Sequence, residues 1–156
     1  MFNTEVLGRV LQGIPMIKLR YPGDSFVIKI QRRQYVRVPA VVDVAIHPVQ
    51  DEFLPFTTIT EDISAGGSLL LLDQQAHPVQ QGADVVAVFI LPFQDGEYHY
   101  LKLRSKIIRR INEDETGRSL FSLQFLNVTS IERQTLLRFT FDRQLAMKKK
   151  GIDYNE

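Results

Sequence analysis

The sequence predicts a mainly β fold in which five or six antiparallel strands form a small closed or nearly closed barrel, followed by one C-terminal α-helix. Three observations support this class. Apolar and polar residues alternate over much of the chain, which is the period of a half-buried strand. Turn residues separate the alternating runs at regular spacing. A helical repeat of apolar residues follows the last of these runs.

Length and composition agree with a compact domain. A chain of 156 residues can bury about 70% of the surface of its unfolded state, which is enough for a core without cross-links. The sequence has no cysteine, which excludes disulfides, thiol catalysis and thiolate metal sites. Its N-terminus lacks the pattern of a signal peptide, and no run approaches the ~20 apolar residues of a membrane span. We therefore expect a cytoplasmic protein.

Residues 1–30 read as an incomplete β unit. Apolar residues lie on both sides of Gly13, and others alternate from Phe26 toward residue 30. Two or three strands cannot bury two faces by themselves. We expect residues 1–30 to be a partial N-terminal β segment with a linker, and residues 31–156 to form the barrel domain.

The barrel strands are expected over residues 42–47, 57–63, 68–72, 85–91, 98–111 and 121–125. Residues 85–91 are apolar on both faces, so this strand should be central and covered. Asp95-Gly96 and residues 112–117 supply turns, and an irregularity is expected at Ile107-Ile108.

The C-terminal helix has recognisable ends. Thr129 to Glu132 fits a capping box, and Gly151 follows a run of lysines as a stop signal. The residues that should pack on the barrel recur at helical spacing and are Leu137, Phe141 and Leu145. A different face, which is either buried as well or contacts another subunit or domain, carries Leu136, Phe139 and Met147. A homodimer is therefore left open.

Two short motifs favour a ligand site. Arg33 and Arg37 supply planar cationic forks, which can grip phosphate or the acceptor edge of guanine. Further along the chain, the segment D-I-S-A-G-G begins at Asp62, whose carboxylate can accept hydrogen bonds from a base or a ribose. Gly66 and Gly67 would permit positive φ and a close approach of the backbone to a ligand. Together the motifs predict a site for a small anionic nucleotide.

In order and composition these motifs resemble the signature of the PilZ domain family, the bacterial receptors for cyclic di-GMP, which is R-x-x-x-R followed by [D/N]-x-S-x-x-G. Arg33 and Arg37 match the first motif, and Asp62, Ser64 and Gly67 match the second. The resemblance implies a six-stranded PilZ-type barrel with a C-terminal helix.

The resemblance extends over roughly residues 31–150 of the chain. Residues 1–30 look like the last strands of the extra N-terminal domain of flagellar-brake-type PilZ proteins. On this interpretation they are remnant strands of a larger domain.

The resemblance also implies roles for individual residues. In the family, the two arginines hold the phosphates and guanines of cyclic di-GMP, and the Asp-x-Ser turn contacts a guanine. Arg32 is a third cation beside the motif. Because relatives with a basic residue there can hold a stacked ligand dimer, Arg32 is the candidate for setting ligand stoichiometry. The expected ligand-binding residues are Arg32, Arg33, Arg37, Asp62, Ser64, Gly66 and Gly67.

The function implied by the resemblance is that of a cyclic di-GMP receptor. Ligand binding would reorient the N-terminal part relative to the barrel, provided that the ligand favours one arrangement. We expect a protein partner, for which the flagellar and biofilm machineries are candidates, and no cofactor besides the ligand. The alternative is a PilZ-like adapter with no ligand requirement, against which the intact motifs count.

Other classes are disfavoured. Ser64 lacks the context of a nucleophile elbow, and His47, His77 and His99 lack metal-ligand spacing, so neither an enzyme nor a metal site is expected. A net charge of +1 argues against a nucleic-acid partner. The basic run from Lys102 to Arg110 is interpreted as a solvated strand face.

Overall fold

The computed structural model describes residues 3–26, 31, 33–72, 79–111, 119–149 and 151. The chain divides into two compact units, Met1–Gln34 and Tyr35–Glu156. The first unit contains the antiparallel hairpin of β1 (Val6–Gln12) and β2 (Ile14–Leu19), and a single 3-10 turn, η1 (Asp24–Phe26). Most large apolar side chains of this hairpin are exposed. Phe26 lies in the 3-10 turn, and residues 27–30 lie outside the described residues.

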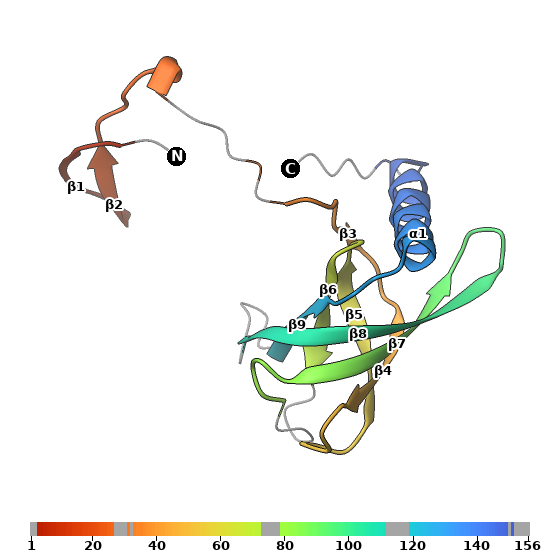
Figure 1. Ribbon diagram of the computed structural model, residues 1–156. Helices are drawn as coiled ribbons and strands as arrows, with labels where there is room; N and C mark the ends of the chain where they lie inside the picture. Colours follow the sequence, from red (N-terminus) through yellow and green to blue (C-terminus); the bar gives the residue numbers. More distant parts are fainter. Residues whose placement is uncertain are drawn as a thin grey trace. The chain divides into compact units, whose positions relative to one another are not determined.

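The second unit is a closed antiparallel barrel (Figure 1), which confirms the predicted fold class. Its strands are β3 (Val38–Pro39), β4 (Asp43–Pro48), β5 (Phe56–Ile63), β6 (Gly67–Leu72), β7 (Asp84–Pro92), β8 (Tyr98–Ile111) and β9 (Ser119–Phe125). The order is β5-β4-β7-β8-β9-β6, and β6 pairs back with β5 to close the ring. The short strand β3 pairs with β5 beside the ring.

Alternation along the strands explains the barrel interior. Val44 and Ile46 of β4 are buried, whereas His47 of the same strand is exposed. The register of β8 against β9 shifts between Ile107 and Arg109, which confirms the expected irregularity. The turn expected over residues 112–117 lies outside the described residues.

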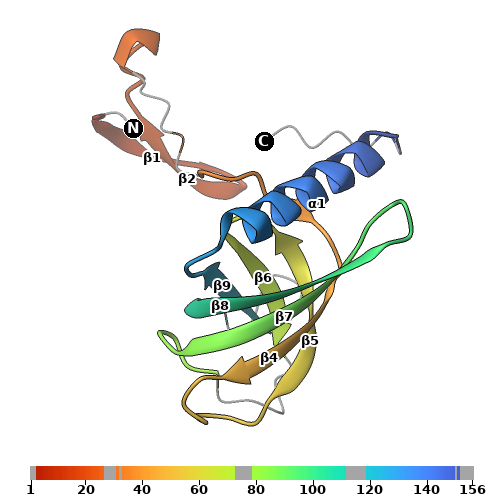
Figure 2. The ribbon, with the colours of Figure 1, turned by 45° about the vertical axis from the view of Figure 1, so that its right-hand side comes forward.

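Strand β7 corrects one expectation. It is central, between β4 and β8, but its burial alternates between buried and half-buried residues, so the prediction of cover on both faces is wrong. The helix α1 (Ser130–Lys149) lies across one end of the barrel and leaves this outer face partly accessible (Figure 2). Two basic residues of β8 share that face and are exposed: Lys102, paired with Val88, and Arg104, paired with Val86. Lys106 of the same strand pairs with Asp84 at 3.6 Å. Arg109 and Arg110, which follow the register shift, are also exposed.

The ends of α1 are those that the sequence predicts. The backbone N–H of Thr129 donates to Glu132 Oε2 at 2.8 Å, and the N–H of Glu132 donates to Thr129 Oγ1 at 3.3 Å, which is a capping box. Gly151 has a φ of 72°, and its N–H donates to the carbonyl of Lys148 at 3.0 Å. The helix therefore starts and stops through local contacts.

The face by which α1 packs was predicted wrongly. Leu136 and Phe139 are fully buried. The residues that were expected to pack on the barrel are exposed instead: Leu137 by 46%, Phe141 by 61% and Leu145 by 41%. The helix carries two apolar stripes, and periodicity alone does not select between them. The selection comes from the partners: Phe139 meets Phe93 edge-on at 5.5 Å, and Arg143 on the same side donates to the carbonyl of Pro92.

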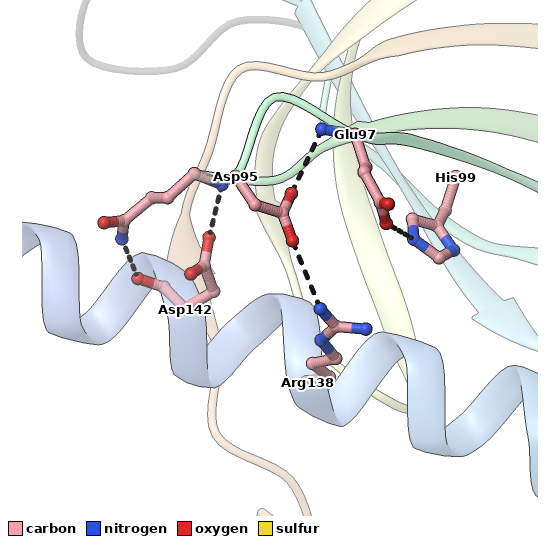
Figure 3. A network of polar contacts seen from close by, with 6 residues as sticks. Asp95, Glu97, His99, Arg138 and Asp142 are labelled. Carbon is pink, nitrogen blue, oxygen red and sulfur yellow. Dashed lines mark hydrogen bonds and ion pairs between the residues drawn. The ribbon is translucent and has the colours of Figure 1, made fainter.

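A polar network joins α1 to the tip of the β7–β8 hairpin (Figure 3). Gln94 donates from its side chain to the carbonyl of Asp142 at 2.8 Å and from its backbone to the Asp142 carboxylate at 3.2 Å. Arg138 pairs with Asp95 at 3.3 Å, and the other oxygen of Asp95 accepts from the N–H of Glu97 at 3.0 Å. The network fixes the helix against the barrel from its middle turns.

Within the described ranges, no helix combines the length and the apolar character needed to cross a membrane. The same residues bring together no group of three or more His, Cys, Asp and Glu that could hold a metal ion. Of the three histidines, His77 lies outside the described residues.

Candidate functional site

The segment predicted to form the ligand turn connects β5 to β6. Ser64 closes it from within: its N–H and its hydroxyl both donate to the carbonyl of Gly67, at 2.9 Å and 3.0 Å. The N–H of Gly66 donates in turn to Ser64 Oγ at 3.3 Å. Ser64 is buried, with 5% of its surface exposed. In this arrangement its hydroxyl shapes the turn rather than facing solvent.

Asp62 lies at a register shift between β5 and β6. Its side chain is half-buried, and Oδ1 accepts a hydrogen bond from the N–H of Leu69 at 3.2 Å. The carbonyl of Asp62 accepts from the hydroxyl of Ser68 at 2.6 Å. The bond from Leu69 fixes the direction of the carboxylate, because the backbone holds one of its two oxygens.

The two glycines serve a different purpose from the one expected. Neither Gly66 nor Gly67 has a φ in the left-handed region, so that part of the prediction is wrong. Both glycines have close neighbours, and these neighbours belong to the protein itself, while the approach of a ligand stays a prediction. A Cβ on Gly67 would lie 2.2 Å from the carbonyl oxygen of Leu123, and one on Gly66 would lie 2.9 Å from the ring of Tyr35.

The segment that carries Arg37, called the basic segment below, reaches this turn through β3. Val38 pairs with Ile63 and Pro39 with Asp62, so the exposed Arg37 directly precedes the residue paired with the end of β5. The structure thus brings Arg37, which directly precedes β3, close to the end of β5 that carries Asp62. Arg33 is exposed and belongs to the first unit, and Arg32 lies outside the described residues.

Two residues at this turn were not singled out as functional from the sequence. Tyr35 lies between the two arginines of the first motif, and its ring packs on Gly66. Arg133 of α1 donates to the Tyr35 hydroxyl at 2.6 Å and to the carbonyl of Ala65 at 3.2 Å. The position of Tyr35 within R-x-x-x-R could have indicated from the sequence that this residue belongs to the site. Arg133 had none, since the bond spans 98 residues of sequence.

Comparison with known families gives one match to this unit. The family model described as PilZ domain matches residues 31–142. The match includes both motifs, the whole barrel and more than half of α1.

Individual relatives agree with that match. The uncharacterized protein YpfA of Bacillus subtilis (strain 168) is 30% identical over 152 residues, which are 96% of this chain and 67% of YpfA. The solved structure of the Bacillus subtilis inhibitor of motility, MotI/DgrA, superimposes with a TM-score of 0.75 at 28% identity, covering 93% of this chain and 66% of that one. YcgR from Escherichia coli, solved in complex with c-di-GMP, gives a TM-score of 0.62 at 20% identity, covering 78% of this chain and 50% of YcgR. The chain thus spans between half and two thirds of the length of these proteins.

Proposed function

The chain belongs to the PilZ domain family, and on that premise we propose that it is a cyclic di-GMP receptor module rather than an enzyme. The observation that supports this most directly is the pairing of Val38 and Pro39 with Ile63 and Asp62, which puts Arg37 beside the Asp62 turn. A guanidinium fork just before β3 and a carboxylate on the neighbouring β5 are complementary to phosphate and to a guanine edge. The E. coli relative with this fold was solved with that ligand.

The proposed roles follow from the chemistry of each group. Arg33 and Arg37 grip the phosphates or the O6/N7 edge of a guanine, because a guanidinium donates two parallel hydrogen bonds. The Asp62 carboxylate accepts from the N–H groups of the guanine base. Ser64 acts from inside the turn, since its hydroxyl is bonded to the carbonyl of Gly67.

The output step is part of the same proposal. We assign residues 1–30 to an N-terminal β segment with a linker and residues 31–156 to the receptor domain. A ligand that orders the basic segment joining them would change their relative orientation, as long as it binds one arrangement more tightly than the others.

The proposal includes a cytoplasmic location and a protein partner. MotI/DgrA, at 28% identity, is an inhibitor of motility, so flagellar machinery is the first partner to examine for this chain. The partner is inferred from a relative of which this chain covers 66%, and the cytoplasmic location is inferred from the sequence.

Isothermal titration calorimetry on the purified protein tests the ligand. We expect cyclic di-GMP to bind at micromolar or tighter affinity, with little response to GMP, GTP or cyclic di-AMP, because the proposed contacts recognise two phosphates together with guanine edges. Folded protein that gives no heat with cyclic di-GMP at high concentration would favour the ligand-independent adapter instead.

Arg32 is expected to set the number of ligands. Two stacked cyclic dinucleotides bring four phosphate charges into one site, and an added cation at short range offsets part of their repulsion. We predict about two ligands per chain, falling toward one in Arg32→Leu while binding persists. Stoichiometry is measured by calorimetry with independently quantified active protein, and a ratio of one in the parent protein would contradict this role for Arg32.

A further inference from the structure

Arg133 and Tyr35 make a three-part contact at the candidate site, although they come from opposite ends of the barrel unit in sequence. Arg133 Nη1 donates to the Tyr35 hydroxyl at 2.6 Å and to the carbonyl of Ala65 at 3.2 Å. The guanidinium carbon lies 5.1 Å from the centre of the Tyr35 ring, within the range of a cation–π interaction. One side chain of α1 thus holds both the basic segment and the turn.

The Tyr35 ring also packs on Gly66. A Cβ at Gly66 would come within 2.9 Å of ring atom Cδ2, so the ring occupies the space that only a glycine leaves. Tyr35 is half-buried and packs against the hydrophobic core. Its ring is therefore restrained by the turn and by the helix together.

The position of Tyr35 in the chain links this contact to Arg37. Tyr35 precedes Arg37 by two residues, and Val38 is the first residue paired with β5. The backbone around Arg37 is thereby anchored on both sides, by the Tyr35 ring before it and by the β3–β5 pairing after it.

We propose that Tyr35 and Arg133 form a latch that holds the basic segment on the Asp62 turn, which makes Arg133 a positioning residue for ligand binding and connects the site to α1. The inference rests on the proposed function, because it concerns the affinity of that same site. With the latch closed, less of the segment has to be ordered when the ligand binds, and a preorganised site binds more tightly.

The geometry also separates this role from simple charge. Both acceptors of Arg133 are uncharged, so these hydrogen bonds do not neutralise the guanidinium. If Arg133 acted only through its charge, Tyr35→Phe would leave affinity unchanged, because that variant keeps the charge and the ring. If the latch operates, removing the phenol oxygen weakens binding by itself.

A double-mutant cycle on the full chain tests the latch. The variants are Tyr35→Phe, Arg133→Gln and the combination, titrated with cyclic di-GMP. We expect each single variant to lose about ten-fold in affinity. The double variant should bind no more weakly than the single variant with the larger loss, because both substitutions remove one shared contact. Arg138→Gln is the control: this arginine lies on the same helix but pairs with Asp95, and its variant should bind as the parent does.

Hydrogen exchange of ligand-free protein gives a second readout. Amides in peptides covering residues 35–42 should exchange faster in both single variants and at the parent rate in Arg138→Gln. Because this measurement uses ligand-free protein, it tests the latch even if the parent binds no cyclic di-GMP. In that case only the receptor proposal fails. Additive affinity losses, or exchange in Tyr35→Phe equal to that of the parent, would overturn the latch. The conservative Tyr35→Phe keeps the test valid if Arg133→Gln does not fold.

Discussion

Phe139→Ala should lower the free energy of unfolding by about 3–5 kcal/mol, the usual cost of removing a buried aromatic side chain. Phe139 is fully buried, meets Phe93 edge-on at 5.5 Å and lies 5.0 Å from the guanidinium carbon of Arg143. Alanine would leave a cavity under α1 that the rigid barrel end cannot fill. Urea unfolding followed by circular dichroism measures the loss.

Phe141→Ala is the matched control on the same helix. Its side chain is 61% exposed, so we expect a change within about 0.5 kcal/mol. A large loss at Phe141 and a small one at Phe139 would mean that α1 packs by the stripe of Leu137, Phe141 and Leu145, as helical spacing alone suggested.

Gly67→Ala is expected to cost at least about 3 kcal/mol, because the new methyl group collides with main chain. Its Cβ would lie 2.2 Å from the carbonyl oxygen of Leu123, and Gly67 is paired with Gln124 in the β6–β9 ladder. Neither strand can move aside without breaking barrel pairing. Thermal unfolding of the ligand-free protein is the measurement.

Gly66→Ala makes the same chemical change one residue earlier. Its obstacle is the Tyr35 side chain rather than main chain, and the ring can shift only by loosening its contact with Arg133, so we expect a smaller loss of about 1–2 kcal/mol. Equal losses of unfolding free energy in Gly66→Ala and Gly67→Ala would show that the collision with the Leu123 carbonyl is not what makes Gly67 necessary.

Much of the barrel was predictable because its strands bury one face. Alternation located β4, β8 and β9, the glycine turn located β5 and β6 on either side of it, and the capping box located the start of α1. These signals are local, since the period of two and the Thr129–Glu132 pair depend on neighbouring residues. The buried face of α1 was not predictable in the same way, because the choice depends on Phe93, which lies far away in sequence.

In the candidate site, too, local features were predictable and contacts between distant residues were not. The order of the two motifs predicted Arg37 and Asp62 as site residues, and the β3–β5 pairing brings Arg37, which directly precedes β3, close to the strand of Asp62. The work of the two glycines was misjudged, because the groups that crowd them, the Leu123 carbonyl and the Tyr35 ring, come from elsewhere in the fold. A sequence pattern shows that a small residue is present but not what approaches it.

The central claim is that the Arg37–Asp62 site binds cyclic di-GMP, and its most direct test is a parallel calorimetric titration of the parent, Arg37→Ala and Arg110→Ala. Both arginines are exposed, but Arg110 lies on β8, opposite Phe121 of β9. We predict that Arg37→Ala loses about ten-fold or more in affinity, the worth of a good bidentate contact, with an unchanged thermal midpoint, while Arg110→Ala binds as the parent does. Equal affinity in all three proteins, or a loss in Arg37→Ala matched by a loss of stability, would contradict it.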